Sequence, residues 1–544
     1  MEKVLTSKAL WQDFDPQSEP LESDVLKIEE NDGITTKTVY FTGRTVEDGK
    51  TRVLAKICYN SARKSSNALL LIDNYKKPIK DEELRYWAQN GFTTMAIDFG
   101  GRSSSGISTL YPPSLDYCNG DVAQGYFYVG TSAKQTKIYE YALNCMRAVT
   151  YLLQEEKAKK ISVLTVKKGS AVGIIVLGTD TRLTNGAVVF GSLSRAYAAG
   201  DLNALNALNN DKLSEQIANE EKRQIWEAGI APQSYAMQIT VPVYLVIAAN
   251  STHVSAYNSN KMYYRMNDDC RIHMIPLSID YMTDENLQSV VNFFKGKNPP
   301  KNIEIEQITT EQGDNFLKVN SPLPTSKLEV WYSRTPERRC RNWVQAKLKN
   351  TPDGCIAELD AYAPKCKMIA YAIAKGAVDI STTFCDVEIN NPSFVKSPNR
   401  SVFIGEKVGH MIPFVAGSAY HGSEQQVEFA KGYLDIVGAK GTSLASFALN
   451  DPCVNRPEIF TISFDVCCSV AQPLSVRIVS DFRSNHEVYQ QTVQLLGDGK
   501  WQRITLDGVG FKKVGGRQID DQEDVKMLHF EARSEFIINN VFIV

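Results

Sequence analysis

The stretch ISVLTVKKGSAVGIIVLG, residues 161–178, determines how the first half of the chain is interpreted. Its first six residues are mostly apolar and β-branched, which is typical of a strand buried on both faces of a sheet. The apolar run after Gly169 is typical of a buried helix. A tight turn must then join strand to helix around Lys167 and Lys168. The residues of this turn are therefore the first candidates for chemistry.

The same alternation of strand and helix extends over the chain on both sides of this stretch. Residues 25–31, 35–43 and 51–60 alternate apolar and polar side chains, as antiparallel strands with one solvated face do. Buried strands are predicted at residues 67–73, 92–101, 161–166, 185–192, 241–250 and 270–278, and helices at residues 80–91, 136–156, 255–266 and 287–296. We therefore expect an α/β domain over residues 1–300, with a mostly parallel sheet and helices on both faces.

Two parts of this domain depart from the alternation. Residues 1–24 have no periodic pattern, which indicates an irregular lead-in. The segment near residues 195–238 is polar and helical, and we expect it to be an insert over one end of the sheet.

From residue 301 onward the pattern consists of short strands only. Residues 301–390 fit a small β-sandwich, and residues 391–544 fit a second all-β domain. A stretch rich in Pro, Ser and Asn at residues 390–399 is the expected linker between them. The basic run RTPERRCR, residues 334–341, is expected to be a solvated loop. The predicted fold class is thus an α/β domain followed by two all-β domains.

Composition limits the classes of function. The chain has 544 residues, 22% of them charged, and a net charge of −2, so no strongly basic surface for nucleic acid is expected. No apolar run approaches the ~18 residues that span a bilayer, and the N-terminus lacks the pattern of a signal peptide. The 11 cysteines have no metal-type spacing, which favours a reducing cytoplasm. We expect no nucleic acid or membrane partner, no metal and no other cofactor; the oligomeric state stays open.

Three segments resemble one known superfamily. NGFTTMAIDFGGRSSSG (90–106), ALNCMRAVTYL (142–152) and TNGAVVFGS (184–192) occur in the order and spacing of the α/β-hydrolase superfamily. They are most similar to its acetylxylan-esterase-like acyl hydrolase group, and the resemblance covers residues 25 to 297. It implies a catalytic triad in the chain order nucleophile, acid, histidine, with the nucleophile on a sharp G-x-S-x-G turn.

The triad positions implied by the resemblance hold unusual residues. Small flanking residues are needed two positions on either side of the nucleophile, and only Thr165–Gly169 satisfies this, which places Lys167 there. The alternative, Ser170, has large flanking residues and would fall inside the helix. Ser251 stands at the acid position and Asp280 at the histidine position. We therefore assign no catalytic residue with confidence and regard the triad as degenerate.

Other features leave a binding role open. Lys167 and Asp280 would form an ion pair in the place of the serine and the histidine. The oxyanion-type backbone N–H groups would come from Lys168 and from the loop near Asn74 or Tyr75, and side-chain changes do not remove them. His253, near the acid loop, is a candidate ligand-binding residue, although a solvated loop histidine is the plainer interpretation. His273 alternates with apolar residues inside a strand, and we expect a core histidine.

The C-terminal segments GDGKWQRITLDGVGF (497–511) and FIINNVFIV (536–544) resemble galactose-binding-like jelly-roll modules. The resemblance implies carbohydrate binding and makes Trp501 a candidate ligand residue, although its strand position also fits a core role.

Three functions stay open at this point, and so does the question whether the chain is an enzyme. The favoured one is a pseudoenzyme, a non-catalytic protein that binds a saccharide or an acylated small molecule. The second is an active carboxylic-ester hydrolase, an acetyl esterase on acylated sugars that uses unidentified residues. The third is a structural or interaction protein.

Overall fold

The computed structural model describes residues 6–73, 78–100, 106–119, 128–191, 219–251, 256–276, 282–300, 303–309, 315–335, 341–352, 354–397, 400–405, 414–416, 427–454, 460–479, 488–513 and 527–543. The chain divides into two compact units, which are described separately. The first comprises Met1–Val246 with Asn258–Arg271, and the second Ile247–Tyr257 with Ile272–Val544.

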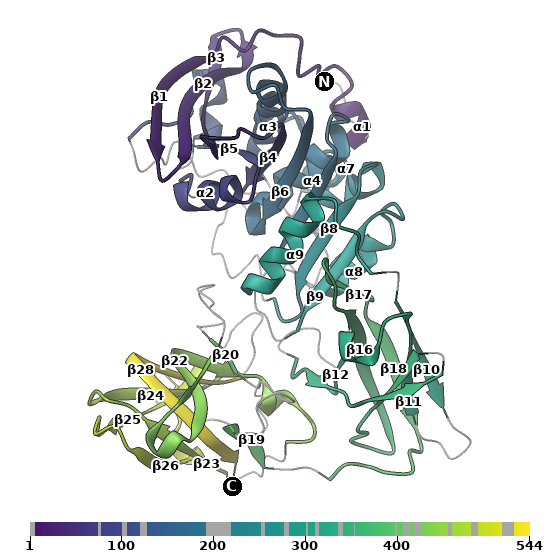
Figure 1. Cartoon of the computed structure of the whole chain (residues 1–544), viewed down its shortest axis with the longest axis vertical. Helices are drawn as coiled ribbons and strands as arrows, with labels where there is room; N and C mark the ends of the chain where they lie inside the picture. The colour runs from purple at the N-terminus through teal and green to yellow at the C-terminus, as the bar shows by residue number, and fades with distance from the viewer. Residues whose placement is uncertain are drawn as a thin grey trace. The chain divides into compact units, whose positions relative to one another are not determined.

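A mixed nine-stranded sheet organises the N-terminal half of the chain (Figure 1). The strand order is β1-β2-β3-β5-β4-β6-β7-β8-β9, so β4 and β5 exchange places relative to the sequence. The first three strands pair antiparallel, and β5, β4, β6, β7 and β8 are parallel to one another. The strands are β1 Asp24–Asn31, β2 Ile34–Val46, β3 Gly49–Asn60, β4 Asn67–Ile72, β5 Thr93–Ile97, β6 Lys160–Val166, β7 Asn185–Val189, β8 Val243–Ala248 and β9 Arg271–Ile275.

The β1–β2 hairpin is set by its turn sequence. Asp32 and Gly33 have φ angles of 52° and 71°. Two consecutive positive φ angles define a two-residue turn whose twist matches that of the flanking strands, and Asp-Gly is among the sequences that adopt it readily. The turn therefore fixes the register in which Asn31 faces Ile34.

Helices α2, α3 and α4 pack against strands of this sheet, and further helices lie in the same stretch of the chain, as the alternation of the sequence predicts. The helices are α1 Ser7–Leu10, α2 Asp81–Gln89, α3 Lys137–Gln154, α4 Ser170–Thr179, α7 Glu220–Gly229, α8 Ala256–Tyr263 and α9 Asp284–Phe294. Helix α4 packs against α3 and against strands β4, β6 and β7, and eight consecutive residues from Ser170 to Leu177 are buried. A helix covered on several sides needs no polar face, which explains the unbroken apolar run in its sequence. The mixed sheet with its helices confirms the coarse α/β prediction.

The N-terminal segment packs against helix α3. Apart from the short helix α1, its described residues before β1 form turns and bends, which agrees with the expected irregular lead-in. Trp11 stacks on Tyr139 with ring centroids 4.4 Å apart, and its indole N–H donates to the Tyr235 hydroxyl over 2.9 Å. The buried Arg147 guanidinium donates to the carbonyl oxygens of Pro16 and Pro20 over 2.6 and 3.1 Å. This segment adds to the cover that α4 and the sheet give to α3, and the helix is buried from Ile138 to Leu152. The predicted insert lies partly outside the described residues; its described end contains α7.

The all-β part of the second unit contains three sheets, and it confirms the prediction of strands only. Two small sheets, ordered β10-β11-β15-β14 and β13-β12-β16-β17 with β18 on β16, share one apolar core. A ten-stranded sheet contains β19 to β28. The strands are β10 Glu304–Thr309, β11 Asn315–Asn320, β12 Leu328–Ser333, β13 Val344–Gln345, β14 Leu348–Thr351, β15 Gly354–Glu358, β16 Lys365–Ala374, β17 Ile380–Ser381, β18 Cys385–Asn390, β19 Ser401–Phe403, β20 Phe414–Ala416, β21 Glu428–Lys431, β22 Val437–Ser446, β23 Thr461–Cys467, β24 Gln472–Val479, β25 Val488–Leu495, β26 Trp501–Asp507, β27 Lys512–Lys513 and β28 Met527–Ile543. The domain limits at residues 300 and 390 stay predictions.

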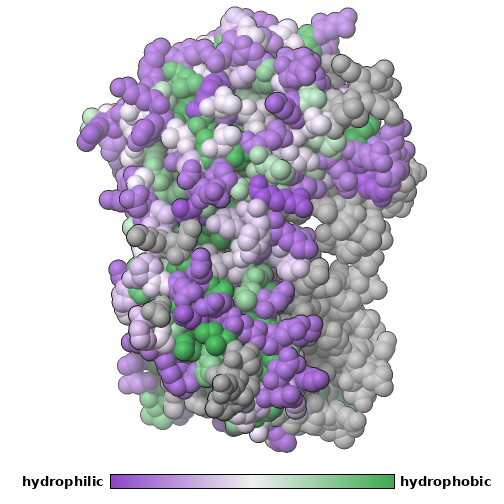
Figure 2. Space-filling view, turned by 90° about the vertical axis from the view of Figure 1, so that its right-hand side faces the viewer, coloured by the Kyte–Doolittle hydropathy of each residue, from purple (hydrophilic) through white to green (hydrophobic). Residues whose placement is uncertain are grey.

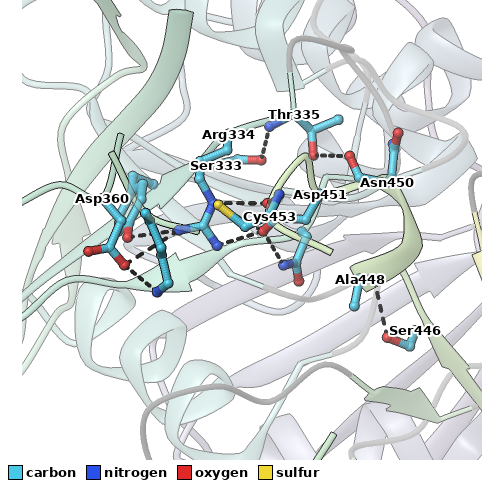
Figure 3. Close-up of polar contacts among 12 residues, drawn as sticks. Ser333, Arg334, Thr335, Asp360, Ser446, Ala448, Asn450, Asp451 and Cys453 are labelled. Carbon is cyan, nitrogen blue, oxygen red and sulfur yellow. Dashed lines mark hydrogen bonds and ion pairs between the residues drawn. The ribbon is translucent and has the colours of Figure 1, made fainter. Parts of the chain in front are cut away.

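A buried ion pair ties the smaller sheets to the ten-stranded sheet within the second unit (Figure 3). Arg334, directly after β12, donates from Nη2 and Nε to the two carboxylate oxygens of Asp451 over 2.7 and 2.9 Å. Both residues are 2% exposed. The amide of Asn342 donates to the same carboxylate over 2.8 Å. The expectation of a solvated loop at residues 334–341 is therefore wrong at both ends, since Arg341 is also buried; residues 336–340 lie outside the described part.

The described surface is largely polar. On the face drawn in Figure 2, the coloured residues are mostly hydrophilic, and the hydrophobic ones form small groups separated by polar side chains. None of the helices in the described ranges is long and apolar enough to cross a membrane.

Candidate functional site

The turn between β6 and α4 is strained at Lys167. Strand β6 ends at Val166, a single 3-10 turn covers Lys167–Gly169, and α4 begins at Ser170. Lys167 has a φ of 49°, in the left-handed region that side chains other than glycine disfavour. A strained residue at the carboxyl end of a central parallel strand is a feature that folds keep at sites of function. The structure thus places Lys167 at the sharp turn that its sequence frame indicates.

Close packing explains why the flanking residues must be small. A Cβ atom on Gly169 would lie 2.3 Å from the carbonyl oxygen of Ile72 and 2.5 Å from that of Asp73. On the other flank, the side chain of Thr165 fits against Gly173, where an added Cβ would lie 2.5 Å from the threonine Cβ. The turn is therefore held between the end of β4 and the first turns of α4, and its backbone has little freedom to move.

Ser170, the alternative nucleophile, is directed away from solvent. Its side chain is 2% exposed, and its hydroxyl donates to the carbonyl oxygen of Lys167 over 2.7 Å. Gly191 packs so closely against it that an added Cβ would lie 2.4 Å from the serine Oγ. A nucleophile must reach a substrate and give its proton to a base. Ser170 meets neither condition within the described residues, because its hydroxyl is buried and the proton is committed to a main-chain carbonyl.

The lysines of the turn remain accessible. The side chain of Lys167 is half-buried and Lys168 is exposed. No described acidic side chain forms an ion pair with Lys167. Its proposed partner, Asp280, lies outside the described residues, as do the loop residues Asn74 and Tyr75 and the candidate ligand residue His253; these assignments stay predictions.

The loop that carries the expected acid position, Ser251, has a structural role in the second unit. Asn250, which follows β8, is 1% exposed, and its amide donates to the carbonyl oxygen of Arg341 over 2.9 Å. Its side-chain oxygen accepts from the Arg341 N–H and from the Trp343 indole over 3.1 and 3.2 Å. Ser251, next along the chain, is also buried, and its N–H donates to the carbonyl oxygen of Ala248 over 3.2 Å. This loop carries hydrogen bonds that hold the backbone at residues 341–343, and neither side chain contributes a carboxylate.

His273 is a core residue, as expected. It lies in β9, is 1% exposed, and shares a hydrogen bond of 3.0 Å between its Nε2 and the side-chain oxygen of Asn286. Burial lowers its pKa to about 4, so the imidazole is neutral at physiological pH. A histidine enclosed in this way is not a general base for an external substrate.

Trp501 occupies the first position of β26 and is half-buried. Its indole N–H donates to the carbonyl oxygen of Tyr433 over 2.8 Å, and its ring lies against Gly432, where an added Cβ would be 2.6 Å from Cζ2. The indole edge is thus engaged by the neighbouring turn. Its candidacy for stacking on a sugar ring stays a prediction.

A polar cavity that the sequence did not indicate lies beside the N-terminal segment in the first unit. It has a volume of about 260 Å³ and is lined by Asp13, Phe14, Asp15, Ser18, Glu19, Gly43, Arg44, Thr45, Lys134, Tyr139, Leu143 and Arg147. Its residues come from three distant parts of the chain, and the lead-in has no motif, so no local signal could have identified it.

Next to this cavity, Glu140 is an unusual buried acid. It is 1% exposed and pairs with Arg44, yet its Oε2 has no hydrogen-bond partner among the described residues. Burial raises the pKa of Glu140 to about 7, against the lowering effect of Arg44. The carboxyl therefore changes its protonation near neutral pH.

The described residues contain no cluster of His, Cys, Asp or Glu that could hold a metal ion. The cysteines in the described ranges are free thiols, and all but Cys385 are buried.

Comparison with known proteins gives one family match and several structural likenesses. Residues 183–341 match the family described as PhoPQ-activated pathogenicity-related protein, which is less than half of the chain. No curated protein is significantly similar to the chain. Among solved structures, an acetyl xylan esterase from Paenibacillus sp. R4 is 17% identical with a TM-score of 0.42, covering 53% of this chain and 92% of its own.

Two further structures are similar at the same level. Acetyl xylan esterase 1 from Thermoanaerobacterium sp. JW/SL YS485 is 13% identical with a TM-score of 0.45, covering 54% of this chain and 95% of its own. A glucuronoyl esterase from Solibacter usitatus is 12% identical with a TM-score of 0.36, covering 54% of this chain and 94% of its own. The structural neighbours are thus acetyl xylan esterases and other esterases. Such distant likeness does not identify a reaction for this chain.

Proposed function

We propose that this chain is a non-catalytic protein of α/β-hydrolase-like fold that binds a saccharide or an acylated small molecule. One observation carries the proposal. The hydroxyl nearest the strained turn, that of Ser170, is buried and donates to the carbonyl oxygen of Lys167, while Lys167 itself occupies the turn. The fold keeps the shape of the turn, but the described residues around it supply no activated hydroxyl.

The chemistry of lysine supports this interpretation. An ester hydrolase must form an acyl-enzyme that water can cleave. An acyl group transferred to the Lys167 amine would form an amide, which is stable in water, so the protein would be blocked after one event. A lysine ammonium is instead well suited to binding, because it offers three hydrogen-bond donors to the hydroxyl and carbonyl oxygens of an acylated sugar.

The proposal also includes the cellular compartment in which the protein acts. Free thiols persist in a reducing compartment, and the described cysteines form no disulfide. We propose on this basis that the protein acts in the cytoplasm.

An esterase assay tests the absence of catalysis. Purified protein, a Lys167→Ala variant and a Ser170→Ala variant are incubated with p-nitrophenyl acetate and with acetylated xylo-oligosaccharides. We expect hydrolysis no faster than in buffer for all three proteins. Turnover by the unaltered protein that disappears in either variant would overturn the proposal and would favour an active acetyl esterase.

Calorimetric titration tests the binding role. Acetylated and deacetylated xylo-oligosaccharides are titrated into the unaltered protein, the Lys167→Ala variant and a Lys160→Ala variant. Lys160 is an exposed lysine at the opposite end of β6, so it controls for the loss of charge. We expect binding that weakens about tenfold in Lys167→Ala and is unchanged in Lys160→Ala. Binding that is absent throughout, or unaffected by Lys167→Ala, contradicts a binding site at this turn.

A further inference from the structure

Strand β1 forms an open edge of the nine-stranded sheet (Figure 1). It is the terminal strand and pairs only with β2 among the described strands. All eight of its residues are exposed, including Val25, Leu26 and Ile28 at 51%, 47% and 60%. An exposed edge presents unpaired N–H and C=O groups to another strand, and exposed apolar side chains on it make such pairing favourable.

The sequence of β1 is complementary to itself. If two copies of the strand pair antiparallel about Ile28, each Lys27 faces Glu29 of the other copy, and the two Ile28 side chains face each other. In the single chain, Lys27 and Glu29 are 2.7 Å apart and remain 63% and 45% exposed, so both can contact a second strand. Opposite charges placed directly across an antiparallel pair stabilise it, and like charges destabilise it.

The geometry points to β1 as a self-association surface: we propose that two copies of this chain pair through their β1 strands, about a two-fold axis at Ile28. Antiparallel pairing of identical strands is what a two-fold axis generates, because the same surface then serves both partners. The sheets of the two copies become continuous, and the exposed apolar side chains of β1 lose solvent contact. This assembly is independent of the proposed ligand site.

Two features of β1 limit the strength of this contact. The register shifts between Val25 and Lys27, which shortens the regular part of the strand. Bulges and lysines on edge strands reduce uncontrolled pairing. One strand pair also buries less area than a standard stable interface. We therefore expect a reversible dimer whose population rises with protein concentration.

Charge reversal gives a specific test. In a dimer of the Lys27→Glu variant, two acidic side chains would face each other at positions 27 and 29. In a dimer of the Glu29→Lys variant, two basic side chains would face each other there. We expect each single variant to dimerise at least about tenfold more weakly than the unaltered chain in sedimentation velocity. An equimolar mixture of the two variants restores complementary pairs, so it should form a heterodimer, and the double variant should recover the original dimer.

A control variant and three possible results decide whether the chain dimerises through β1. A matched control is Lys367→Glu, which reverses a charge in a somewhat more exposed Lys–Glu pair on another sheet and should leave dimerisation unchanged. A chain that stays monomeric up to its solubility limit overturns the proposal. So does a dimer that tolerates both single reversals, or single variants that fail to associate when mixed. Circular dichroism of each variant verifies that the fold is intact.

Discussion

The φ of 49° at Lys167 implies that a side chain at this position lowers the stability of the protein. A left-handed conformation costs a residue with a Cβ atom about 1–2 kcal/mol, and glycine avoids this cost. Glycine also loses more chain entropy on folding, which offsets about 0.5–1 kcal/mol. We expect Lys167→Gly to raise the free energy of unfolding slightly, by about 0.5–1 kcal/mol.

The measurement is urea unfolding of the two matched glycine variants, Lys167→Gly and Lys168→Gly. Lys168 has no positive φ, so its variant should lose stability. If Lys167→Gly is destabilised as much as Lys168→Gly, strain at the turn is not what distinguishes this residue.

The raised pKa of Glu140 makes the stability of the folded protein depend on pH. In the unfolded chain its carboxyl ionises near the ordinary value of 4.5, and in the folded protein its pKa is about 7. The folded state therefore binds more protons between these two values, and its stability falls as the pH rises through this window. The shift corresponds to about 3 kcal/mol.

A Glu140→Gln variant lacks this titration. We expect its stability relative to the unaltered protein to improve by about 2–3 kcal/mol between pH 5 and pH 8, because only the unaltered protein loses the contribution. Unfolding midpoints of the two proteins at several pH values measure it. Parallel pH profiles for the two proteins would contradict a buried carboxyl with a raised pKa.

At the scale of elements, periodicity in the sequence predicted strands β1 to β9 and helices α2, α3, α4, α8 and α9 in chain order, but not helix α1. Two sets of contacts were missed because their causes are tertiary. The N-terminal segment has no pattern of its own, and its order comes from Arg147 and Tyr139, which lie more than a hundred residues away. Arg334 has the sequence context of a solvated loop, but its partner Asp451 is 117 residues further along. A local pattern cannot reveal such a partner.

At the candidate site, too, local features could be predicted from the sequence, whereas contacts between distant residues could not. The frame around Lys167 could be read from small residues at fixed positions, because backbone approach there excludes a Cβ. Ser170 packs closely against Gly191, which follows strand β7, and the role of Asn250 depends on residues 341–343. The sequence therefore indicated the position of the turn, but not the burial of Ser170 or the hydrogen bonds of Asn250.

Gly169 tests the close approach of the turn to β4. In Gly169→Ala the new Cβ would meet two backbone carbonyl oxygens, which cannot rotate aside. We expect a loss of about 2–3 kcal/mol of unfolding free energy. Gly130→Ala is the comparison variant, since the nearest atoms to its new Cβ belong to the Gln135 side chain rather than to backbone carbonyls, so it should be tolerated better than Gly169→Ala. Equal stability of the two variants would mean that the turn can move away from β4.

At the scale of the whole molecule, the buried pair Arg334–Asp451 connects the sheets of the second unit. Removing one partner leaves an uncompensated buried charge, so Arg334→Met and Asp451→Leu should each cost about 3–5 kcal/mol. The double variant leaves neither charge and should be much less destabilised than the sum. Urea unfolding followed by the fluorescence of Trp331 and Trp343 reports on this unit. Additive losses would show that the two charges are not coupled.

The central claim, that the strained turn of this chain carries no activated nucleophile, has one most direct measurement. The intact protein is incubated with a fluorophosphonate, which phosphonylates serines activated by a neighbouring base, and its mass is then determined. A serine esterase treated alongside verifies the reagent. We expect the mass of the folded protein to remain unchanged. A stoichiometric adduct, mapped to Ser170 or to any other serine, would contradict the account and identify the nucleophile of an active hydrolase.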